Sequence, residues 1–281
     1  MQQENSPPIQ RRSLFACAIT AVLATILAAS PVPALAGPSE APRQASPRQG
    51  ANVHCDADLT VSPATMREPV LLVPPTEKTI PSDHPLIAEL INSGHTTCIL
   101  AIPRTDAASP SRASQHVFDT LRAMIEIHSD KISVVTIGSG ALPSILAIGK
   151  WPAAAHVIKD LVAISPDLDP RNRTTLSNAR STGLETTFIV SGTDAVGLAH
   201  TVDDLLPHPE SPLRIVRTQD VCGPYSPEAL TLQTTWDTFV RTGQITFQTL
   251  AADPVAQLLA IDALASDGPA EPRRVPRSSC P

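Results

Sequence analysis

The stretch KISVVTIGSGALPSILAI, residues 131–148, decides the fold that this sequence predicts. Ile132–Ile137 consists mainly of β-branched residues and is typical of a buried strand. The turn Gly138–Gly140 follows without a break, and the apolar segment Ala141–Ile148 after it is interpreted as a helix. Small residues let the backbone bend sharply between the two. The stretch therefore predicts a strand, a tight turn and a helix, which we call the elbow (Val134–Ala147).

Two other interpretations of the turn are open at this point. Gly138-Ser139-Gly140 resembles the start of a dinucleotide-binding loop, but Pro143 replaces the third glycine and the preceding strand is not the first one. The remaining interpretation is a plain glycine connection between two elements, because glycine is the usual residue at strained turns.

Apolar runs and segments of helical period alternate on both sides of the elbow. This alternation predicts the α/β class, a mostly parallel central sheet with helices on both faces. The expected strands are Pro69–Val73, Thr96–Ile102, Ile132–Ile137, Leu161–Ser165, Thr187–Ser191 and Leu213–Arg217. The expected helices are His84–Ser93, Ala113–Ile127, Ala141–Ile148, Pro227–Arg241 and Pro254–Ala265.

Length and charge narrow the class of protein. The chain has 281 residues, enough for one domain with a full hydrophobic core. Its formal net charge is −6, and it contains one Tyr and two Trp. Nucleic-acid binding relies on basic patches and stacking aromatics, so we do not expect nucleic acid as a partner.

The N-terminus has the pattern of a signal peptide, which we assign to residues 1–36. Arg11 and Arg12 precede an apolar stretch over residues 14–29, and residues 34–36 form an A-x-A cleavage site. The apolar stretch is short for a membrane span, so we expect export, cleavage and no stable membrane span afterwards. The paired arginines suggest twin-arginine export, and the expected location is secreted or in the periplasm and cell envelope.

The segments that flank the alternating pattern are polar. Residues 37–53 are rich in Pro, Ser, Gln and Gly and have no apolar period, so a disordered linker is expected there. Residues 54–281 then form a single α/β domain. Its tail, residues 267–281, resembles the linker in composition, although Cys280 would tie down the end.

The chain has five cysteines, of which Cys17 lies in the signal peptide. The four that remain are Cys55, Cys98, Cys222 and Cys280. An even number in an exported chain predicts two disulfides, for which four cysteines allow three pairings. A zinc site is the alternative, but no two of the four are spaced as closely as zinc ligands usually are, so we expect no metal.

Six short segments together resemble one known family. They are Val70–Pro74 with Thr76, Gly94–Cys98, Lys131–Thr136, Ala163–Asp167, Ser191–Asp194 and Val221–Pro224. Their order and spacing are similar to those of the Candida antarctica lipase B-like family of α/β-hydrolases, over residues 55–222. The resemblance implies an α/β-hydrolase fold with the catalytic position in the elbow. It also implies the disulfides Cys55–Cys98 and Cys222–Cys280.

The same resemblance shows that the expected nucleophile is missing. An ungapped alignment over Lys131–Asp167 places Gly138 at the nucleophile position. Ser139 then falls on the residue whose backbone N–H helps to form the oxyanion hole. A shift by one residue makes Ser139 the nucleophile, but it puts Ile137 at a flanking position that needs a small residue.

Some of the other site residues that the resemblance implies are present in this sequence, and some are replaced. Thr76 stands in the oxyanion loop, Asp194 at the triad acid and Asp167 at a residue that lines the pocket. Pro75 and Glu77 replace glycines beside Thr76. A carboxylate in that place opposes a developing oxyanion instead of stabilising it.

The triad also requires a histidine after the last strand, Leu213–Arg217. All eight histidines precede it: His54, His84, His95, His116, His128, His156, His200 and His208. The histidine position falls on Glu228, and a carboxylate has the wrong proton affinity to act as the base for a serine hydroxyl near neutral pH. His200 and His208 follow Asp194 and are the fallback bases, although loop histidines are mostly solvated.

Three functional hypotheses follow. In the first, the protein is a secreted pseudo-hydrolase with a degenerate triad that binds a lipid or ester ligand. In the alternative, it is an active secreted lipase or carboxylesterase that uses Ser139, Asp194 and an unexpected histidine. The third is a carboxylate site formed by Asp167, Asp194 and Glu228. We expect no cofactor in any of them.

Overall fold

The structure is a computed structural model that describes residues 53–56, 67–76, 79–128, 131–168, 182–191, 213–223 and 250–280. These residues all belong to one compact unit, Ala45–Pro281. The expected signal peptide, the expected linker up to residue 52 and the expected helix Pro227–Arg241 lie outside the described residues. So do Glu77, Asp194, His200, His208 and Glu228.

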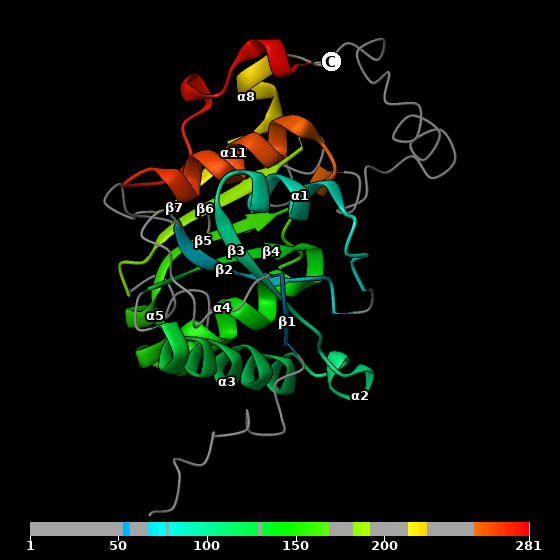
Figure 1. Cartoon of the computed structure of the whole chain (residues 1–281), viewed down its shortest axis with the longest axis vertical. Coiled ribbons are helices and arrows are strands. Elements are labelled where there is room, and N and C mark those ends of the chain that lie inside the picture. The colour runs from blue at the N-terminus through cyan, green and yellow to red at the C-terminus, as the bar shows by residue number, and fades with distance from the viewer. Residues whose placement is uncertain are drawn as a thin grey trace, which may run out of the picture. The chain divides into compact units, whose positions relative to one another are not determined.

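A seven-stranded sheet lies at the centre of the described structure (Figure 1). Its strand order is β1-β3-β2-β4-β5-β6-β7; β1 runs antiparallel to β3, and the other neighbouring pairs are parallel. The strands are β1 (Val53–Cys55), β2 (Arg67–Val73), β3 (His95–Leu100), β4 (Ile132–Ile137), β5 (Ile158–Ile164), β6 (Glu185–Val190) and β7 (Leu213–Arg217). The predicted α/β class is confirmed.

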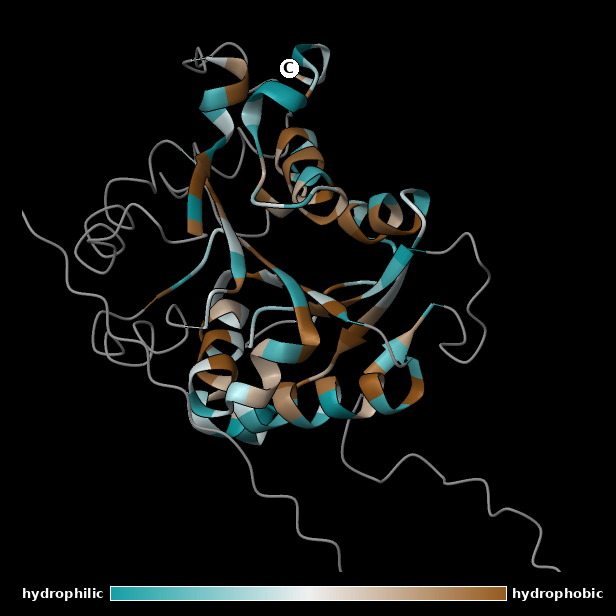
Figure 2. Cartoon of the chain, turned by 90° about the vertical axis from the view of Figure 1, so that its left-hand side faces the viewer, coloured by the Kyte–Doolittle hydropathy of each residue, from teal (hydrophilic) through white to brown (hydrophobic). Residues whose placement is uncertain are grey.

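Helices cover both faces of the sheet (Figure 2). The α3, α4 and α5 helices pack on one face, and α1, α8 and α11 pack on the other. The helices are α1 (Pro85–Asn92), α2 (Arg104–Ala107), α3 (Pro110–His128), α4 (Ala141–Lys150), α5 (Pro152–Val157), α8 (Thr218–Cys222) and α11 (Pro254–Ala265). Short 3-10 turns are η1 (Gly138–Gly140), η4 (Pro272–Arg274) and η5 (Arg277–Ser279).

The β4 strand shows why the elbow sequence is so uniformly apolar. All six of its residues are buried. Successive side chains of a strand point to opposite faces, so Val134 packs in the cluster with α3 and α4, while Val135 packs in the cluster with α1 and α11. A strand covered on both faces cannot alternate apolar with polar residues.

The β5 strand differs from its prediction at its first residues. It begins at Ile158, three residues before the expected start at Leu161. Lys159 and Asp160 interrupt the apolar run. A prediction based on hydropathy therefore starts the strand after them. The structure nevertheless buries Asp160, which is 3% exposed.

A second prediction concerns the tail after α11, which resembles a disordered linker in composition. In the structure this tail packs against the rest of the domain up to Cys280. The Ala270 N–H donates to Thr187 Oγ1 at 3.0 Å, which attaches the tail to β6. The Asp262 carboxylate of α11 accepts the Glu271 N–H at 2.7 Å. The residues that hold the tail belong to other elements, β6 and α11. The composition of the tail itself contains no sign of these partners, and it therefore suggested a linker.

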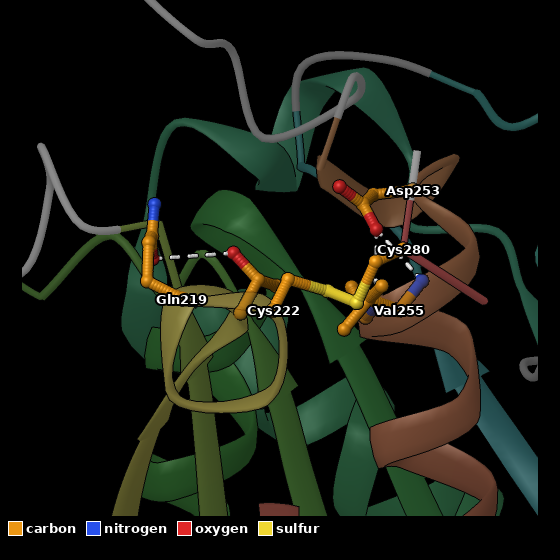
Figure 3. Close-up of a disulfide and its surroundings, with 7 residues drawn as sticks. Gln219, Cys222, Asp253, Val255 and Cys280 are labelled. Carbon is orange, nitrogen blue, oxygen red and sulfur yellow. Dashed lines mark hydrogen bonds between the residues drawn. A yellow bond between two sulfur atoms is a disulfide. The ribbon is translucent and has the colours of Figure 1, made fainter. Parts of the chain in front are cut away.

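Two disulfides have the pairing that the resemblance implies. Cys55–Cys98 joins residues that face each other in β1 and β3. Cys222–Cys280 joins the end of α8 to the tail (Figure 3). Disulfides persist in oxidising compartments, so the pair indicates such a location for this domain. Within the described part of the chain, no helix has the length and apolar character needed to cross a membrane.

Candidate functional site

The elbow is a sharp turn at the carboxyl end of β4. Gly138 directly follows the strand and has φ +56°, in the left-handed region that side-chain-bearing residues avoid. Its carbonyl accepts the Asp167 N–H at 3.1 Å, which ties the turn to the chain after β5. The α4 helix begins three residues after Gly138, at Ala141. The predicted order of strand, turn and helix is therefore confirmed.

Gly140 sits where β2 comes closest to the turn. A Cβ at this residue would lie 2.4 Å from the Pro74 oxygen and 2.6 Å from the Val73 oxygen. Both contacts are with backbone atoms, which cannot swing away as a flexible side chain can. The absence of a side chain at Gly140 therefore lets the loop after β2 lie directly against the elbow.

Gly140→Ala is expected to lower the free energy of unfolding by about 1–3 kcal/mol, the usual cost of forcing extra atoms into a packed interior. The added methyl group must push the Pro74 carbonyl or the turn aside. Urea unfolding followed by circular dichroism measures the change. A variant that unfolds at the wild-type urea concentration would show that β2 does not approach the turn so closely.

The second residue of the turn bonds to the loop after β2. The Thr76 N–H donates to Ser139 Oγ at 3.0 Å, and the two hydroxyl oxygens lie 3.3 Å apart. Ser139 Oγ therefore already uses a lone pair to accept a backbone donor. The structure brings together Thr76 and Ser139, the two residues that the resemblance places at an oxyanion hole. The Thr76 N–H, however, already donates to the Ser139 hydroxyl.

Asp167 lies beside this turn through its main chain. It follows β5, and its backbone N–H reaches Gly138, while the residue as a whole is exposed. Asp194 and Glu228, the other two members of the predicted carboxylate site, lie outside the described residues. Thr76, Gly138, Ser139 and Asp167 are thus the described residues of the candidate site, at the carboxyl edge of the sheet.

Three of the described histidines have other partners. His84 caps α1, where its Nδ1 accepts the Leu86 N–H at 3.2 Å, and burial lowers the pKa of this imidazole. His116 Nε2 lies 2.8 Å from the Asp106 carboxylate. His95 Nδ1 is bonded to the Glu68 carbonyl at 2.9 Å, near the opposite edge of the sheet. Within the described ranges, no three metal-ligating side chains gather in the way a metal site needs.

The resemblance implies that Thr76 and Ser139 lie near each other, but it does not imply that the Ser139 hydroxyl accepts the Thr76 N–H. The two residues are 63 positions apart, and no local pattern in either segment predicts this hydrogen bond. The one sequence signal is Gly140, whose missing side chain permits the approach of the β2 loop.

Comparisons with known proteins agree with this architecture. No protein-family model matches the sequence, and no curated protein matches it either. Among solved structures, the chain is similar to Aspergillus fumigatus lipase B, with a TM-score of 0.56 and 20% identity. The match covers 78% of this chain but 58% of that one, so the chain spans less than two thirds of the lipase.

A second similar structure is a dienelactone hydrolase from Anabaena variabilis, with a TM-score of 0.46 and 12% identity over 55% of this chain and 76% of that one. At 20% identity, the similarity to lipase B speaks for the fold and not for the chemistry. The parallel sheet, the two helix layers and the elbow after β4 agree with the similarity to lipase B. The chain therefore has the α/β-hydrolase fold, in a form similar to that of lipase B.

Proposed function

We propose that this protein is an exported pseudo-hydrolase, whose site binds a lipid or ester ligand without hydrolysing it through a serine. The observation that carries the proposal is Gly138. In α/β-hydrolases the nucleophile occupies the strained turn directly after the strand. The residue after β4 has that strained conformation, with φ +56°, and has no side chain to attack an ester.

The contact between Ser139 and Thr76 supports the same proposal. An oxyanion hole works through donors that are free to bind the developing charge. The Thr76 N–H is bonded to Ser139 Oγ, so a ligand carbonyl has to displace that hydroxyl before it can use the donor. A ligand can pay this cost at equilibrium, whereas a transition state gains little from a donor that is already satisfied.

The alternative is an active lipase or carboxylesterase that uses Ser139 and Asp194. It requires Ser139 Oγ to leave Thr76 and meet a base, because a serine hydroxyl is a weak nucleophile on its own. Export through the N-terminal signal peptide, to the medium or to the periplasm and cell envelope, completes either proposal. The two disulfides support an oxidising destination.

A fluorophosphonate probe separates the two proposals. The purified protein is expected to remain unlabelled, because no activated serine occupies the elbow. Mass spectrometry of the intact chain detects the adduct, and a serine hydrolase in the same tube serves as the positive control. Labelling of the wild type that disappears in Ser139→Ala would establish the active-esterase alternative. Ligand binding is measured separately, with a non-hydrolysable ether analogue of a triacylglycerol.

A further inference from the structure

A cluster of charged side chains lies at the edge of the sheet opposite to the elbow, where β2, β4 and β5 begin. Lys159 Nζ pairs with the Glu68 carboxylate and donates to the Leu264 carbonyl at 3.3 Å, in the last turn of α11. The same Nζ lies 3.8 Å from Asp160 Oδ2. We call Glu68, Ser133, Lys159 and Asp160 the Lys159 cluster. One ammonium group in it connects two strands to the end of a helix.

Asp160 is the deeply buried acid of this cluster. It is 3% exposed, and Ser133 Oγ donates to its carboxylate at 3.3 Å. Burial raises the pKa of Asp160 to about 7, although the Lys159 ammonium lowers it. Glu185, its register partner in β6, and Glu68 both oppose its ionisation. The local acids therefore outnumber the ammonium once Asp160 is charged.

The remaining charged and titratable groups near Lys159 come from the segment after α11, from β3 and from the first residue of β2. Asp267 acts on Lys159 from the tail. His95, which is 2% exposed, lies near Glu68, Arg67 and Lys159. Burial lowers the pKa of His95, so this imidazole stays neutral near pH 7 and adds no positive charge to the cluster.

We propose that the Asp160 carboxyl is a proton-operated latch, which holds the C-terminal end of α11 against the sheet when protonated and releases it when ionised. With Asp160 neutral, the Lys159 ammonium faces one carboxylate, that of Glu68, and also donates to the Leu264 carbonyl. When the Asp160 proton passes to solvent, the new carboxylate at 3.8 Å draws the ammonium toward itself. The neutral Leu264 carbonyl then competes with two carboxylates for the ammonium group, and its hydrogen bond weakens.

The direction of the pH dependence follows from the two environments of the acid. An exposed aspartate has a pKa of about 3.8 and the latched one about 7, so the latched state holds its proton more tightly. Latching is therefore complete below about pH 4 and is lost as the pH rises to about 7. This device lies at the far edge of the sheet from Gly138 and does not depend on the proposed function.

Histidines in the same fold act in the opposite direction. The lowered pKa values of His84 and His95 mean that their stabilising contribution is present above about pH 6.5 and is lost as the pH falls. The free energy of unfolding of the wild type therefore has two contributions whose pH dependences have opposite signs, one from Asp160 and one from the histidines. The test has to be local to α11 and has to compare the wild type with an Asp160 variant at each pH.

Hydrogen–deuterium exchange of the full-length protein provides that test, followed on peptides spanning residues 258–272 between pH 5 and pH 8 and corrected for chemical exchange. We expect the opening of this segment in the wild type to increase about tenfold per pH unit between pH 5 and pH 7. Asp160→Asn keeps the shape without the charge and is expected to show no such slope. The control Asp119→Asn, at an exposed residue of α3, should behave like the wild type.

Two outcomes would overturn the proposal: a wild type whose 258–272 segment opens equally at pH 5 and pH 7, or an Asp160→Asn variant that keeps the wild-type slope. If the variant does not fold, the side-chain carboxyl of Asp160 is titrated in the wild type by carbon NMR. A midpoint near pH 7 supports the latch, and one below pH 5 rejects it.

Discussion

Gly138→Ser combined with Glu228→His and Ser139→Ala is expected to react with a fluorophosphonate probe at position 138, where the wild type does not react. The first change puts a hydroxyl on the strained residue after β4, and the second puts an imidazole at the histidine position that the resemblance implies. A non-glycine residue at φ +56° costs about 1–2 kcal/mol. This strain is small beside the loss of roughly 10⁶-fold in kcat that follows removal of a nucleophile or its base.

The third change tests the contact between Ser139 and Thr76. Removing the Ser139 hydroxyl frees the Thr76 N–H, and one oxyanion donor is worth about 10²–10³-fold in rate. The triple variant should therefore hydrolyse a p-nitrophenyl ester about 10²-fold faster than the double variant that keeps Ser139. Adding Glu77→Gly is expected to increase the rate again, because it removes a carboxylate from the oxyanion loop.

The matched control replaces Gly138 with alanine in place of serine, which carries the same backbone strain without a hydroxyl. It is expected to stay unlabelled and inactive. If the serine variant is folded by circular dichroism and equals the alanine control in both assays, Gly138 and Glu228 do not together occupy the catalytic positions that the resemblance implies. The assignment of the pseudo-hydrolase site would then be wrong for at least one of these two residues.

Removal of the Cys222–Cys280 disulfide, through Cys222→Ser with Cys280→Ser, is expected to lower the free energy of unfolding by about 3–4 kcal/mol. The bond closes a loop between residues 58 positions apart, and loops of this size give about 4 kcal/mol in the chain-entropy account. The tail has a few hydrogen bonds besides it, such as those at Ala270 and Glu271, so its last residues depend on the covalent link.

Guanidinium unfolding of the oxidised wild type and of the double variant measures this loss. Ser278→Ala, at an exposed residue two positions before Cys280, is the control and should change stability by less than about 0.5 kcal/mol. Exchange of the tail amides is expected to rise in the cysteine variant, with little change in β4. Equal unfolding midpoints for the variant and the wild type would count against a stabilising role for the bond.

Much of the fold could be predicted from residue patterns, and the failures have a common cause. The strands Ile132–Ile137 and Leu213–Arg217 and the helix Pro254–Ala265 have the bounds that periodicity predicts. The β5 strand was predicted too short because Lys159 and Asp160 look like surface residues. Asp160 is buried and Lys159 is half-buried. Glu68, from a strand 91 residues earlier, compensates the Lys159 charge. Hydropathy cannot anticipate a partner so distant in sequence.

The candidate site was likewise predictable from the sequence only in part. Gly138 can be identified as the turn residue from the sequence, because a β-branched strand followed by small residues and a helix permits few other geometries. The role of Ser139 could not be predicted, since it depends on which direction its hydroxyl takes. In the folded chain that direction is set by the Thr76 N–H, which the β2 loop brings to 3.0 Å.

The sequence by itself determined the α/β class, the elbow and the glycine at its first residue, because these follow from local steric and hydrophobic patterns. Only the tertiary structure decided that Ser139 bonds to Thr76, that Asp160 is a buried acid and that the tail is packed. Each of these depends on contacts between segments far apart in the chain, where burial changes proton affinity and one donor satisfies one acceptor.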